Sequence, residues 1–100
     1  PLLAVGAVGV ISVASHWAPA LLGEIIAAYE KGDVQRAIEL NAKLIPSYEY
    51  ETGDPNPNPI PTKALLRAIG QPAGPCRLPL GDAPAGLEER GKAIWDALHA

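Results

Sequence analysis

Ser12, Ser15 and His16 are the residues whose types and spacing would suit acid–base or nucleophilic chemistry. An imidazole titrates near neutral pH and activates hydroxyl nucleophiles in many enzymes. His16 stands beside Trp17 at the expected start of a helix, where a structural hydrogen bond is the more common role. Neither serine has a nearby base that could take its hydroxyl proton. We therefore expect Ser15 to cap that helix and His16 to make a structural hydrogen bond.

The lysines are the other candidate nucleophiles, because a desolvated amine loses its charge and attacks carbonyl groups. All of them fall on expected helices, where solvated faces are the usual setting: Lys31, Lys43, Lys63 and Lys92. We expect none of them to be catalytic. Cys76 is the only cysteine, so it has no internal disulfide partner, and no Cys/His spacing predicts a metal site. We expect no cofactor and no metal.

The stretch from Gly6 to His16 must position Ser12, Ser15 and His16. Val10 to Val13 hold three β-branched aliphatics and one serine, with no charge nearby. A short apolar run bounded by glycines predicts a strand buried on both faces. Gly6 and Gly9 are expected to allow a tight turn or close backbone approach at its entry. We expect a strand over residues 9–14, which needs parallel neighbours that this chain does not contain.

Helices are expected over most of the remaining chain. Residues 1–5 are expected to end a preceding helix, and further helices are expected over 18–31, 34–50, 61–69 and 85–98. Gly32 is expected to end the first of these and Asp33 to cap the next, in which Pro46 should cause a kink. The expected buried side of that second helix consists of Val34, Ala37, Ile38, Leu44, Ile45 and Tyr48. Proline- and glycine-rich stretches at 52–61 and 71–83 predict loops.

Composition excludes several classes of function. The chain has 100 residues, 48% of them hydrophobic, and a net charge of −3 without a basic cluster, which argues against nucleic acid as a partner. Leu2 to Leu22 is nearly long enough to span a bilayer. It carries several polar or helix-breaking residues and has no positively charged flank, so we expect neither a membrane segment nor a signal peptide.

Three blocks of sequence resemble one enzyme family. They are Gly6-x-x-Gly9-Val10-Ile11-Ser12-Val13, Asn58-Pro59-Ile60-Pro61-Thr62-Lys63 and Arg77-Leu78-Pro79-Leu80. Their order and approximate spacing are similar to the C-terminal third of the dihydrodipicolinate synthase family, which includes N-acetylneuraminate lyase and related pyruvate aldolases. The loop before Asn58 is about two residues longer than the family's pattern, and Thr62 replaces a frequent valine.

The resemblance implies an α/β fold, the (β/α)8 or TIM barrel, which needs about 250 residues. We therefore expect the chain to be a piece of a larger protein and mostly α within its own length. Residues 1–31 would form the end of the barrel, with its last strand at 9–14 and the following helix. Residues 32–100 would form a C-terminal helical extension, with Lys63 and Arg77 anchoring it through carboxylates or helix ends.

The resemblance also implies an activity. The complete enzyme would be a Schiff-base lyase that condenses pyruvate with aspartate semialdehyde in lysine biosynthesis, as a cytoplasmic homotetramer. Its Schiff-base lysine and proton-relay tyrosine have no matching position here, so we expect no catalytic residue in this chain. The one site element carried over is Ile11, whose backbone carbonyl would line the pyruvate pocket. The rest of the barrel, or another copy of the chain, would pair with the strand.

Two alternatives stay open. One is a sister pyruvate aldolase acting on a sugar acid such as N-acetylneuraminate, because substrate choice would depend on residues upstream. The other is a helical interaction module without catalysis of its own.

Overall fold

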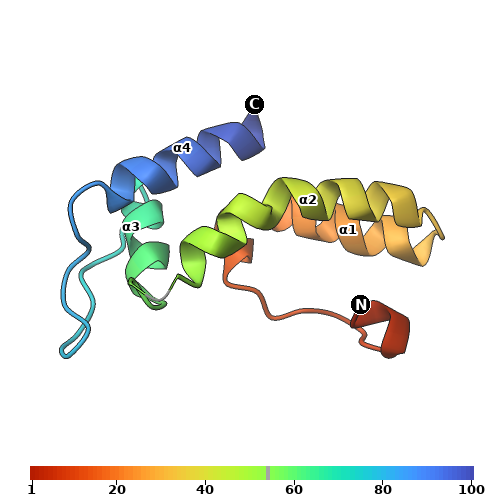
Figure 1. Ribbon diagram of the computed structural model, residues 1–100, viewed down its shortest axis with the longest axis horizontal. Coiled ribbons are helices and arrows are strands. Elements are labelled where there is room, and N and C mark those ends of the chain that lie inside the picture. Colours follow the sequence, from red (N-terminus) through yellow and green to blue (C-terminus); the bar gives the residue numbers. More distant parts are fainter. Residues whose placement is uncertain (54) are drawn as a thin grey trace.

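Helices make up most of the chain, as expected. The computed structural model describes residues 1–53 and 55–100 (Figure 1). Asp54, in the predicted loop at 52–61, lies outside the described residues. The elements are the short 3-10 turns η1 (Leu3–Val5) and η2 (Ala14–His16) and the helices α1 (Pro19–Glu30), α2 (Val34–Glu51), α3 (Ile60–Ala68) and α4 (Leu87–His99).

The molecule is elongated, with extents of 43 × 28 × 22 Å, and α2 connects its two ends. The first half of α2 packs antiparallel to α1, and its C-terminal part contacts η2, α3 and α4, of which α3 and α4 pack against each other (Figure 1). Pro46 lies inside α2, which continues to Glu51. The core lies where these elements meet, and it includes Trp17, Leu44, Tyr50 and Leu65.

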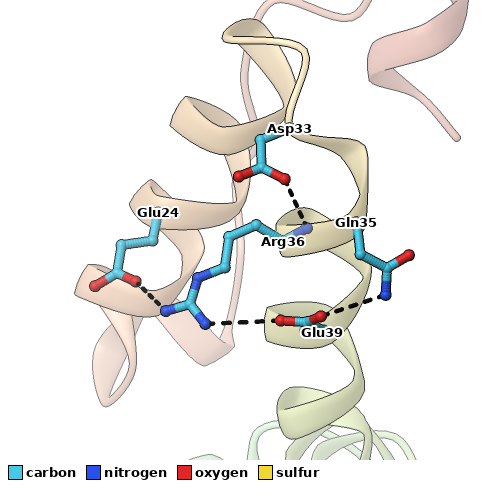
Figure 2. Close-up of polar contacts among 5 residues, drawn as sticks. All are labelled: Glu24, Asp33, Gln35, Arg36 and Glu39. Atoms are coloured by element: carbon cyan, nitrogen blue, oxygen red, sulfur yellow. Dashed lines mark hydrogen bonds and ion pairs between the residues drawn. The ribbon is translucent and has the colours of Figure 1, made fainter.

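The turn between α1 and α2 follows the sequence prediction. Gly32 has a φ of +80°, a conformation that a residue without a Cβ adopts at little cost, and α1 ends there. The Asp33 side chain accepts a hydrogen bond from the Arg36 amide at 3.1 Å and so caps α2. The Arg36 guanidinium lies 3.5 Å from a Glu24 carboxylate oxygen and 4.0 Å from one on Glu39 (Figure 2). These exposed ion pairs add little stability, so capping and packing hold the hairpin together.

The predicted buried side of α2 is partly wrong. Ala37 and Leu44 are buried and Tyr48 is half-buried, as expected. Val34, Ile38 and Ile45 are exposed, and the residues buried in their place are Leu40, Ser47, Tyr50 and Glu51. The reason is that α2 meets α1 along one part and α3 and α4 along another, so no single helical face describes its burial.

The predicted strand at 9–14 does not form in the part of the chain that the structure describes. Residues 7–12 are irregular, Val13 already has helical backbone angles, and Ala14 begins η2. A strand exists through hydrogen bonds to neighbours, and residues 7–12 have no backbone partner beyond one bond from the Ala7 amide to the Leu2 carbonyl. Gly6 forms a tight turn, as expected, with a φ of +97°, whereas Gly9 has neither a positive φ nor a close neighbour among the described residues.

Candidate functional site

Ile11, the predicted substrate-binding residue, lies at the end of this irregular segment, and its side chain is fully exposed. The two carbonyl groups that follow it are already occupied. The Ser12 carbonyl accepts from the Ser15 hydroxyl at 2.5 Å, and the Val13 carbonyl lies 2.9 Å from Nδ1 of His16. In the described residues no hydrogen bond reaches the Ile11 carbonyl. It is therefore the last carbonyl before the turn that is free to contact a ligand.

The turn itself is held by structural hydrogen bonds. His16 makes the structural bond that the sequence predicts, because one of its ring nitrogens contacts the Val13 carbonyl. The prediction that Ser15 caps the following helix is wrong: α1 begins at Pro19, with Ala18 at the cap position and no side-chain cap. The Ser15 hydroxyl instead donates back to Ser12 and closes the 3-10 turn. These contacts give the serines and the histidine a role in turn geometry.

Trp17 fixes this turn to α2. Its indole N–H donates a 2.9 Å hydrogen bond to the Ser47 hydroxyl, and both side chains are buried. A buried indole N–H normally finds such an acceptor. Sequence reasoning missed Ser47. A signal was present, since Ser47 shares a helical face with Leu40 and Leu44, and a small polar residue there indicates a buried hydrogen bond.

A buried carboxyl lies one turn further along α2. The Glu51 residue is 9% exposed, and its Oε2 atom is buried without a hydrogen-bond partner among the described residues. Desolvation raises the pKa of Glu51 above its ordinary value. Desolvation also raises the pKa of the Tyr48 hydroxyl, and the neighbouring Glu51 charge adds to that effect. Glu51 was not among the residues predicted to be buried on α2.

An apolar groove of about 200 Å³ runs beside the irregular segment. Residues of the N-terminal segment form one wall and residues of α1 and α2 the other, among them Leu2, Gly9, Val10, Leu22, Ile26 and Tyr48. No charged side chain lines it. Such a lining suits the packing of apolar side chains better than the binding of a charged metabolite.

The lysines lie away from the Ile11 turn in sequence and element. Lys63 Nζ donates to the Pro75 carbonyl at 3.0 Å, and Lys92 pairs with Asp96 at 2.6 Å. Lys31 and Lys43 are exposed, at the end of α1 and on α2.

The expected anchoring of the helical extension onto a barrel by Lys63 and Arg77 stays a prediction. Within the described residues, Lys63 reaches a loop carbonyl and the exposed Arg77 has no ion pair. Arg67, which was not among the expected anchors, holds the extension itself together. Its Nε lies 2.7 Å from a Glu88 carboxylate oxygen, and its Nη1 donates to the Gly74 carbonyl. One arginine thus joins α3, α4 and the loop between them.

Residues 1–53 and 55–100 hold no group of three or more histidine, cysteine, aspartate or glutamate side chains that would suit a metal ion. Within the same ranges, no helix has the length and apolar character needed to cross a membrane.

Comparison with known proteins decides the family. The profile of the dihydrodipicolinate synthetase family matches residues 1–97. The chain belongs to this family. The 4-hydroxy-tetrahydrodipicolinate synthase of Listeria monocytogenes serotype 4a (strain HCC23) is 44% identical over 98 residues, which is 98% of this chain and 33% of that protein. The enzyme of the same name from Methanopyrus kandleri is 43% identical over 89 residues, or 89% of this chain and 29% of that protein.

The chain therefore spans about one third of the length of the curated members of the dihydrodipicolinate synthetase family that it matches. The resemblance predicted from the three sequence blocks is confirmed.

Proposed function

We propose that this chain forms the C-terminal third of a Schiff-base lyase that condenses pyruvate with aspartate semialdehyde in lysine biosynthesis. One observation carries the proposal: the chain is 44% identical, over 98% of its length, to a protein named 4-hydroxy-tetrahydrodipicolinate synthase. The substrates follow from the family resemblance described above. Residues 1–31 would be the end of the barrel and residues 32–100 its helical extension.

The unpaired segment supports the barrel part of the proposal. Val8, Val10 and Ile11 are exposed and their backbone groups lack partners in the described residues. A parallel strand buried on both faces would look like this when its neighbouring strands are absent, because its ladder and its apolar cover both come from outside. The last strand of a (β/α)8 barrel is such an element.

The Ile11 carbonyl is the proposed contact with pyruvate. Barrel enzymes form their active sites at the C-terminal ends of the strands. Ile11 lies just before the turn that leads into η2 and α1, which is the C-terminal end of the proposed strand. Its carbonyl has no hydrogen-bond partner in the described residues, whereas the Ser15 and His16 side chains bond to the next two carbonyls.

The remaining parts of the proposal concern the complete enzyme. Its Schiff-base lysine and proton-relay tyrosine would lie in the part that precedes this chain. A cytoplasmic location and a homotetrameric assembly, both implied by the family resemblance, belong to the same proposal.

Reductive trapping tests the proposed function. The complete enzyme is incubated with pyruvate and borohydride, digested and mapped by mass spectrometry. We expect one pyruvyl adduct, on a lysine upstream of this chain. The lysines of this chain should stay unmodified: Lys31, Lys43, Lys63 and Lys92. An adduct on Lys63, for example, would contradict the assignment of this chain to the scaffold.

Turnover assays with the same preparation separate the alternatives. Consumption of aspartate semialdehyde supports the proposed synthase. A pyruvyl adduct with turnover of N-acetylneuraminate alone would identify a sister aldolase. The absence of any adduct would leave a helical module without catalysis.

A further inference from the structure

Glu51 is the buried ionisable group for which neither the fold nor the proposed reaction has a use. It extends a buried face of α2 that otherwise consists of Ala37, Leu40, Leu44 and Ser47. Ser47 has its hydrogen bond from Trp17, whereas Oε2 of Glu51 has none in the described residues. A leucine would fill such a position without the cost of burying a carboxyl group.

The position of Glu51 follows from its neighbours on α2. Tyr48 lines the apolar groove together with Gly9 and Val10, and Ser47 bonds to Trp17. The segment from Gly9 to Trp17 therefore passes this end of α2. Glu51 comes four residues after Ser47, so it lies on the same helical face, one turn closer to the C-terminus of α2. Glu51 is thus on the face of α2 that bears Ser47, whose hydroxyl bonds to Trp17 just after η2.

Most basic side chains of the second half of the chain contact other groups, and the exposed Arg77 has no ion pair in the described residues. Lys63 donates to the Pro75 carbonyl, Arg67 pairs with Glu88, and the Arg90 guanidinium lies 5.7 Å from the centre of the Tyr50 ring. No ion pair to Glu51 occurs in the described part of the chain. A buried carboxylate is stable only when a positive group or several N–H donors neutralise it.

We propose that Glu51 binds a positively charged N–H group that comes from outside this chain. The group has two sources: a basic side chain of the preceding part of the enzyme, or the ammonium group of the aldehyde substrate. The inference rests on the proposed function, since both sources belong to the complete synthase. The raised pKa of Glu51 in this chain agrees with a site that lacks its counter-ion.

Two substitutions in the complete enzyme test the inference. Glu51→Gln keeps the shape and removes the charge, and Glu51→Leu removes the polar group altogether. Glu49→Gln is the matched control, because Glu49 is exposed on the same helix. Melting temperature and the KM for each substrate are measured for all three variants. We expect Glu49→Gln to behave like the wild type.

The two sources give different results. With a protein donor, both Glu51 variants lower the melting temperature by several degrees, because the donor is left buried and unpaired. With the substrate ammonium as donor, the melting temperature holds or rises, and the KM for the aldehyde increases about tenfold or more while that for pyruvate stays constant.

Two outcomes would overturn the inference. One is a Glu51→Gln enzyme with wild-type melting temperature and both KM values within twofold, which would show that no charge is needed. The other is a Glu51→Leu enzyme that melts higher with unchanged KM values, as expected for an unsatisfied group. The melting temperatures can be measured whether or not the protein is catalytically active. A wild type that traps no pyruvate would therefore refute the proposed function, while the melting temperatures still decide whether a protein donor pairs with Glu51.

Discussion

The contact between Gly91 and Tyr50 makes a sharp prediction about the packing of α4. A Cβ added at Gly91 would lie 2.6 Å from the Tyr50 hydroxyl oxygen, 3.0 Å from its Cζ and 3.1 Å from Cβ of Leu65. That hydroxyl is held by the Leu87 carbonyl at 3.0 Å and the Pro61 carbonyl at 3.1 Å, which share its single proton. The ring is buried, so it does not move aside into solvent without leaving these hydrogen bonds.

The change in the free energy of unfolding caused by Gly91→Ala is the sum of a favourable and an unfavourable contribution. Replacing glycine by alanine inside a helix stabilises it by about 1 kcal/mol. Overpacking costs about 1–3 kcal/mol, and loss of the Tyr50 hydrogen bond adds about 1 kcal/mol. We therefore expect a net destabilisation of about 1–3 kcal/mol. Hydrogen exchange on the complete enzyme measures it, with amides of α3 and α4 exchanging about ten to a hundred times faster.

The chain supplies a control and a rescue for this prediction. Gly23 lies exposed in α1 with nothing near its Cβ position, so Gly23→Ala should stabilise α1 by about 0.5–1 kcal/mol. Tyr50→Phe removes the closest atom, so adding Gly91→Ala to it should cost less than it does in the wild type. A Gly91→Ala enzyme as stable as Gly23→Ala, or an equal cost in both backgrounds, would refute the reasoning.

Three further predictions concern the site and the anchors. Ile11→Val keeps the backbone carbonyl, so the KM for pyruvate should stay within about threefold; loss of pyruvate binding would contradict the carbonyl role. Arg67→Ala should destabilise the α3–α4 end by about 1–2 kcal/mol, whereas Arg36→Ala, which removes exposed pairs, should change the free energy of unfolding by about 0.5 kcal/mol or less in denaturant titrations. Burial raises the pKa of Tyr50 to about 12, so the unfolded chain loses this proton first and stability should fall as pH rises from 10 to 12. Tyr50→Phe should flatten that fall in melts across the same pH range, and an unchanged slope would show that other groups cause it.

The sequence by itself determined the features that depend on local chemistry. Gly32 and Asp33 end one helix and begin the next because a positive φ and a side-chain cap are properties of those residues. The family also followed from sequence, since three short blocks in order resemble it and its profile matches residues 1–97. The role of Ile11 came from that resemblance and stays a prediction.

Tertiary structure decided which side chains are buried and what they contact. Tyr50 and Ser47 are buried because α2 meets different partners along its length, and a helical pattern cannot report where one partner ends and the next begins. At residues 9–14, local composition predicts an element that does not form. The apolar run predicts a strand, but a strand forms only through hydrogen bonds to neighbours, and the described residues supply none.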